Sequence, residues 1–135
     1  MLRLLPSVVK STRGTTFVEA ATYAMLYHCS SEDIQLSGCK LFTFCSRQLQ
    51  CIDDDSNLDN MVVEAVISSM EQFPQHVKLQ EVALEALENI STRPKLLNAL
   101  QSQSPRIISS VHKAMTISKS TDVFERGSDI IAKLS

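Results

Sequence analysis

The sequence repeats itself at a fixed spacing of 45 residues. A nine-residue segment that opens with two bulky apolar residues and ends in methionine occurs at residues 17–25, 62–70 and 107–115. Self-similarity at a period of roughly 20 to 50 residues is typical of chains built from stacked structural units. Each such unit buries its apolar face against its neighbours, so the period restricts the chain to a repetitive architecture.

A second pattern follows each of these segments. Mostly apolar or small residues occupy relative positions 0, 3, 4, 7, 8 and 11, starting at Ile34, Leu79 and Val123. This spacing places them on one stripe of an amphipathic helix. The sequence therefore predicts at least two helices in each unit.

Small residues occupy one common position of this stripe, as Gly38, Ala83 and Gly127. Glycine inside a helix costs roughly 1 kcal/mol relative to alanine. A neighbouring helix that crosses closely would account for the small side chain. We therefore expect close helix packing at these three positions.

The middle unit shows the expected helix bounds most clearly. Helices are predicted over 62–72 and 77–91, with Pro74 interrupting the chain between them. A shorter helix is predicted over 94–101, because proline suits a first helical turn. Its counterpart at 49–52 is expected to be frayed or absent.

Two helix starts carry residues that favour capping. Ser30 with Asp33 matches a capping box, and Asp59 or Asn60 can cap the helix that leads to Met70.

Composition agrees with an all-α fold and argues against several partners. The chain has 3 glycines and 4 prolines in 135 residues, few for a β-sandwich or barrel, and 44% of its residues are hydrophobic. The formal net charge of −2 gives no general attraction to nucleic acid or an anionic membrane. No apolar run approaches the roughly 20 residues that span a bilayer. We expect neither nucleic acid nor a membrane as a partner.

The four cysteines, Cys29, Cys39, Cys45 and Cys51, do not have the spacing of a metal site. Structural zinc ligands come in close pairs, about two to four residues apart, whereas these gaps are ten, six and six positions. We expect reduced cysteines that pack as small apolar residues, and neither a metal nor another cofactor.

The three histidines, His28, His76 and His112, fall at repeat positions or between helices. Catalysis by a nucleophile and a base needs groups brought together from rigid elements. The sequence shows no such arrangement, so we expect no catalytic residue and no enzymatic activity. His112 stands in the register of Ile67 and is expected to be a partly exposed helix residue.

The run from Val77 to Ser91, with its Leu-Glu-Asn-Ile ending, resembles an armadillo-like repeat, and HEAT repeats are the nearest alternative. The likeness covers residues 17–135. It implies an all-α, right-handed α-α superhelix of about three repeats of 44–45 residues. The units implied are a partial unit or flexible lead at 1–16, and repeats at 17–48, 49–92 and 93–135.

The resemblance implies a protein–protein interaction scaffold or adaptor that binds a partner along the concave surface lined by the third helices. The groove asparagine of the family is matched by Asn89, but Phe44 and Lys133 stand at its counterparts. We therefore do not expect the basic-peptide clamp of nuclear import receptors. The alternative function is a regulatory repeat segment, a fragment or short isoform, of a larger multidomain enzyme such as a protein kinase.

Polar positions of the third helices form the candidate partner-binding face. These positions are Lys40, Thr43, Arg47, Glu81, Glu85, Glu88, Asn89, Asp129 and Lys133. The three glutamates form an acidic ridge, and like charges at i and i+4 cost a few tenths of a kcal/mol. A basic protein or peptide would relieve this repulsion, so we expect such a partner.

The two ends of the sequence lead to predictions about self-association and about the location of the protein in the cell. The register suggests that the chain begins inside a unit and has a polar cap at neither end, so we expect self-association through the ends. We expect an intracellular protein, in the cytoplasm or alternatively the nucleus. A mitochondrial location is the third alternative, because residues 1–18 weakly resemble a transit peptide.

Overall fold

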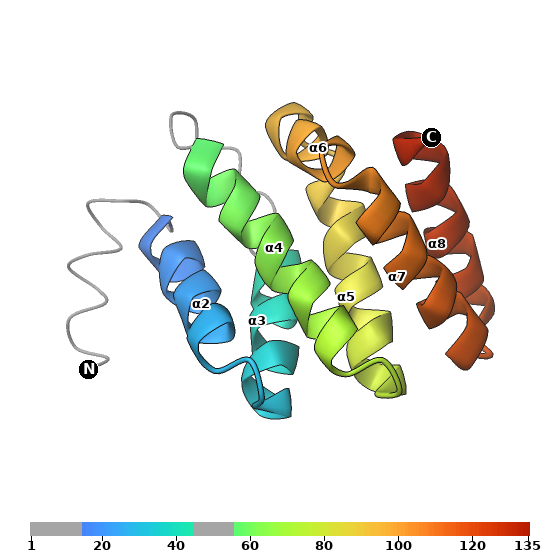
Figure 1. Cartoon of the computed structure of the whole chain (residues 1–135), viewed down its shortest axis with the longest axis horizontal. Helices are drawn as coiled ribbons and strands as arrows, with labels where there is room; N and C mark the ends of the chain where they lie inside the picture. The colour runs from blue at the N-terminus through green and yellow to red at the C-terminus, as the bar shows by residue number, and fades with distance from the viewer. Residues whose placement is uncertain (1–14, 45–55) are drawn as a thin grey trace.

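The computed structural model describes residues 15–44 and 56–135. Within these ranges the chain forms seven α-helices and no strand, which confirms the all-α prediction (Figure 1). The helices are α2 (Thr15–Tyr27), α3 (Glu32–Phe44), α4 (Ser56–Gln72), α5 (Val77–Ile90), α6 (Pro94–Gln101), α7 (Ser104–Ile117) and α8 (Thr121–Leu134). The predicted helix at 49–52 and most of the leading segment 1–16 lie outside the described residues.

The helices form a row of packed pairs. Helix α2 packs on α3, α4 on α5, and α7 on α8. Helices of neighbouring pairs also contact one another, so that α2, α4 and α7 form one layer and α3, α5 and α8 form the other (Figure 1). The short helix α6 packs against α4 and α7. This arrangement places α3, α5 and α8 side by side along one face.

The apolar stripes of the two layers meet in a shared core. Leu79, Leu87 and Ile90 of α5 are fully buried, which confirms that Ile90 is a core residue. Helix α4 is longer than predicted and begins at Ser56. Leu58 explains the difference, because it continues the apolar face toward the N-terminus and is only 2% exposed.

Close packing at the small positions is confirmed for both helical glycines. A Cβ atom on Gly38 would lie 2.6 Å from Cγ of Met25, and one on Gly127 would lie 2.7 Å from Cγ of Met115. In each pair, the methionine of the preceding helix fills the space that a side chain would need. The third small residue, Ala83, is fully buried.

Two buried glutamines join consecutive helices with the same hydrogen bonds. Nε2 of Gln80 donates to the carbonyl oxygens of Met70, at 3.1 Å, and Phe73, at 2.9 Å. Nε2 of Gln35, earlier by 45 positions, donates to Met25 and His28 in the same way, at 2.9 Å each. The last carbonyl groups of a helix lack intrahelical donors, so each glutamine satisfies acceptors where α4 or α2 ends.

Both predicted helix caps are wrong. The amide of Ile34 donates to Oγ of Ser31, because Ser31 directly precedes α3 and Ser30 lies one residue too early. Asp59 and Asn60 lie inside α4, so neither is its cap. The structure instead adds a cap at α5, where Nδ1 of His76 accepts from the amide of Leu79 at 3.0 Å.

One arginine links two neighbouring helix pairs, because it lies on α7 and contacts α4. Arg106 of α7 lies 2.7 Å from carboxylate oxygens of both Glu64 and Glu71 of α4. These hydrogen bonds from the guanidinium lower the pKa of both carboxyl groups below their ordinary values. They also raise the pKa of Arg106, so the cluster is fully charged at neutral pH.

Candidate partner-binding surface

The acidic ridge lies on the side of α5 opposite its apolar stripe. Glu81, Glu85 and Glu88 follow one another along this helix and are all half-buried. Helix α8 packs beside α5 on this side, and Arg126 of α8 comes within 3.6 Å of both Glu85 and Glu88. The ridge therefore lies in the groove between two helices and not on a freely exposed helix face.

A basic side chain from α8 already faces this ridge. The guanidinium of Arg126 lies 3.6 Å from a carboxylate oxygen of Glu85 and 3.6 Å from one of Glu88. These ion pairs are longer than hydrogen bonds. The arginine side chain is 31% exposed, and such solvent-exposed pairs are worth only about 0 to 1 kcal/mol. Arg126 therefore neutralises the ridge in part.

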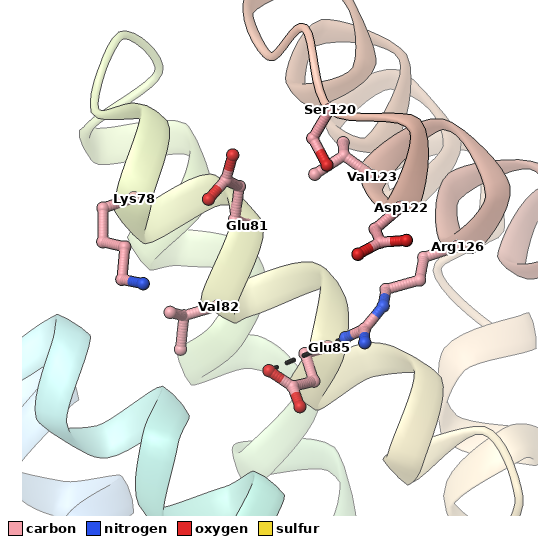
Figure 2. Close-up of a pocket in the computed structure, with 8 residues that line it drawn as sticks. All are labelled: Lys78, Glu81, Val82, Glu85, Ser120, Asp122, Val123 and Arg126. Atoms are coloured by element: carbon pink, nitrogen blue, oxygen red, sulfur yellow. Dashed lines mark ion pairs between the residues drawn. The ribbon is translucent and has the colours of Figure 1, made fainter.

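An open hollow of about 150 Å³ lies between α5 and α8 beside this ion pair. Figure 2 shows Arg126 reaching from α8 toward Glu85 on α5. The lining residues are Lys78, Glu81, Val82, Glu85, Ser120, Asp122, Val123 and Arg126. Three carboxylates and two cations thus surround a space large enough for one side chain of a partner.

Only two residues of the predicted binding face, Glu81 and Glu85, line this hollow. Glu81 accepts a hydrogen bond from the hydroxyl of Ser118 at 3.1 Å. Asn89, the counterpart of the groove asparagine, donates from Nδ2 to the carbonyl oxygen of Glu85 at 2.8 Å. Its amide is therefore bound to its own helix.

The remaining predicted residues are spread along α3 and α8. Lys40 and Asp129 are exposed, and the hydroxyl of Thr43 donates to the carbonyl oxygen of Cys39 at 3.2 Å. Nζ of Lys133 donates to Oγ of Ser91 at 3.1 Å, which links α8 to the end of α5. Arg47 lies outside the described residues.

Sequence reasoning missed four lining residues with polar side chains: Lys78, Ser120, Asp122 and Arg126. The sequence does contain an indication of one of these four residues. Arg126 stands at the stripe position that Ser37 and Val82 occupy in the other two units, so it is the one charged residue at that place. A charge within an apolar stripe indicates a partner on the adjacent helix.

The prediction that the cysteines pack as small apolar residues holds for one of the two cysteines that the structure describes. Cys39 is fully buried, and burial raises the pKa of its thiol to about 12. Cys29 is exposed, so the prediction is wrong for this residue, which lies in the turn after α2. Cys45 and Cys51 lie outside the described residues. No group of three or more metal-ligating side chains occurs within residues 15–44 and 56–135.

The histidines occupy three unrelated places. His28 lies in the exposed turn after α2, and His112 is exposed on α7 as predicted. His76 caps α5, with Nε2 at 3.9 Å from a carboxylate oxygen of Glu32.

Comparison with known proteins does not assign the chain to a family. No family model, curated protein or solved structure matches it. In the part of the chain that the structure describes, no helix has both the length and the apolar character needed to cross a membrane.

Proposed function

We propose that the chain is a protein–protein interaction scaffold, an armadillo-like right-handed superhelix that binds a basic protein or peptide segment and catalyses no reaction. The partner would lie across the layer formed by α3, α5 and α8. Its basic side chains would enter the hollow between α5 and α8. The observation that carries the proposal is this hollow, where Glu81, Glu85 and Asp122 converge.

The repetitive helix contacts support the architecture in this proposal. The glutamine hydrogen bonds recur 45 positions apart, in Gln35 and Gln80, and methionine faces glycine in both α2–α3 and α7–α8. Recurring contacts of this kind stack helix pairs in a regular row, and stacked rows offer long surfaces to extended partners.

The electrostatics of the hollow favour a cationic group. The ion pairs of Arg126 with its two glutamates are long, at 3.6 Å each, and both carboxylates remain partly exposed to solvent. A lysine or arginine of a partner can approach Glu81 and Glu85 from the open side of the hollow. Charge-assisted hydrogen bonds formed there would be shorter and stronger than the existing pairs.

Selection from a random peptide library tests this proposal, because it does not require the partner to be identified first. Peptides displayed on phage are selected on the immobilised full chain, and the best are measured by fluorescence anisotropy. We expect the selected peptides to be rich in lysine and arginine. Replacing Glu85 and Glu88 with lysine should weaken their binding by about tenfold or more, because opposite charges would become like charges.

The matched controls reverse charge elsewhere. Glu19→Lys alters α2 in the other layer and should change affinity by less than about twofold. Selected peptides without a basic bias would contradict the proposal. Equal binding to the chain that carries both Glu85→Lys and Glu88→Lys would also contradict it.

A further inference from the structure

The position of Arg126 in the repeat carries no charge in the other two units. Its counterparts are Ser37 in the first unit and Val82 in the second, so the stacking of the helices does not require a cation there. Val82 is only 7% exposed, whereas the side chain of Arg126 is 31% exposed and extends from α8 toward α5 (Figure 2). The arginine side chain thus lies in the groove between these helices and not in the core.

The two carboxylates that Arg126 contacts differ in their position relative to the hollow between α5 and α8. Glu85 lines the hollow, and its Oε1 lies 3.6 Å from Nη1 of Arg126. Glu88 follows about one turn later on α5, outside the lining, and its Oε1 lies 3.6 Å from Nε of Arg126. One guanidinium therefore contacts a carboxylate in the hollow and a carboxylate beside it.

This geometry lets Arg126 leave the hollow at little cost. The pair with Glu85 is long and partly exposed, and such pairs contribute little to stability. A cation that enters the hollow can take the place of the guanidinium at Glu85, while Nε of Arg126 keeps its contact with Glu88. Arg126 and an incoming cation therefore compete for one carboxylate.

We infer that Arg126 is an internal competitor of the basic partner: it contacts Glu85 in the free chain, keeps only Glu88 when the partner's cation enters, and thereby lowers the affinity of the hollow. Such competition rests on the proposed function, because it requires that the hollow binds a basic side chain. An internal contact lowers affinity by the fraction of chains in which the site is free. For a weak, exposed ion pair the loss is about three- to fivefold.

Fluorescence anisotropy of a fluorescein-labelled octalysine peptide, titrated with the full chain at one fixed low salt concentration, tests this inference. Arg126→Gln removes the competing charge and keeps a polar side chain. The variant should bind the peptide about three- to fivefold more tightly than the unmodified chain. Its far-ultraviolet circular dichroism should equal that of the unmodified chain.

Lys119→Gln is the matched control, because it changes the net charge of the chain by the same amount. Lys119 is exposed in the turn before α8 and lies outside the lining of the hollow. Charges on the surface that make no direct contact are largely screened by salt. This variant should therefore change the affinity by less than about twofold.

A double substitution separates competition for Glu85 from a general effect of charge. In a chain that carries Glu85→Gln, the further change Arg126→Gln should bring no gain in affinity, because the contested carboxylate is absent. A gain that persists without Glu85 would overturn the inference, as would equal gains in Arg126→Gln and Lys119→Gln.

The same titrations distinguish failure of the inference from failure of the proposed function. If the unmodified chain binds octalysine and Arg126→Gln binds it equally or more weakly, the competition is wrong and the basic-partner site stands. If neither chain binds the peptide, the proposed function fails and the competition fails with it.

Discussion

Replacing Gln80 by leucine removes a buried amide whose side chain bridges α4 and α5. Gln80 is 1% exposed, and its Nε2 donates to the carbonyl oxygens of Met70 and Phe73. The helical donor for the Met70 carbonyl would be the amide of residue 74, but proline has no N–H. Gln80 therefore supplies a donor that the backbone cannot supply.

The expected loss of stability follows from these two bonds. The Phe73 carbonyl also accepts from the amide of His76 at 3.1 Å, so it keeps a donor in the variant. The Met70 carbonyl loses the donor that Gln80 provides, and a buried unsatisfied acceptor costs about 1 to 3 kcal/mol. We expect Gln80→Leu to lower the free energy of unfolding by about 2 kcal/mol.

Urea unfolding followed by circular dichroism, at one fixed protein concentration, measures this change. The dependence of the free energy on urea should stay the same, because the area exposed on unfolding hardly changes. Gln101→Leu is the control, since Gln101 is exposed at the end of α6, and it should change stability by less than about 0.5 kcal/mol. A Gln80→Leu chain as stable as the control would refute the reasoning.

Gln80→Glu adds a dependence on pH. The carboxyl group would face two carbonyl oxygens in a buried site, where only its protonated form can donate a hydrogen bond. Its pKa in the folded chain should therefore be raised above the unfolded value of about 4.3. The contribution is fully present below that value and is lost as pH rises through the folded pKa. Unfolding curves between about pH 4 and 8 check this, and a pH-independent difference from the unmodified chain would exclude it.

Three further predictions concern other parts of the fold. Ile90→Ala should lower the free energy of unfolding by about 2 to 5 kcal/mol in the same urea assay, because Ile90 is fully buried. Arg106→Gln should cost about 1 kcal/mol at neutral pH. Because Arg106 lowers the pKa of its two glutamate partners, that contribution is present above their unfolded pKa and disappears as pH falls through the folded values, so stability curves of the two chains should converge in acid. Alkylation at pH 8, mapped by mass spectrometry, should label exposed Cys29 well before buried Cys39, whose thiol has a pKa of about 12.

Several features could be predicted from the sequence because they depend on neighbouring residues. The bounds 94–101 agree with those of α6, where Pro94 marks the first turn. Ile90 is buried as its stripe position predicts. The predicted cap of α3 lies one residue too early, because Ser30 and Ser31 have the same chemistry and only the backbone path decides which one reaches the amide.

Less of the candidate site could be predicted from the sequence. The glutamates of α5 could be identified from their spacing, but their opposing cation could not, because Arg126 lies on a different helix about 40 residues later. The turn position of Cys29 likewise decided its exposure, although the residue type favours burial.

The sequence by itself determined that the described segments are helical and that the residue pattern recurs every 44 to 45 positions. These properties follow from the local periodicity of apolar side chains, which sets the secondary structure and the buried stripe. Only the tertiary structure decided that Arg126 faces the acidic ridge and that the side chain of Gln80 donates to carbonyl groups at the end of α4. Each depends on which side chains of separate helices come within a few ångströms, and no spacing along the chain specifies that.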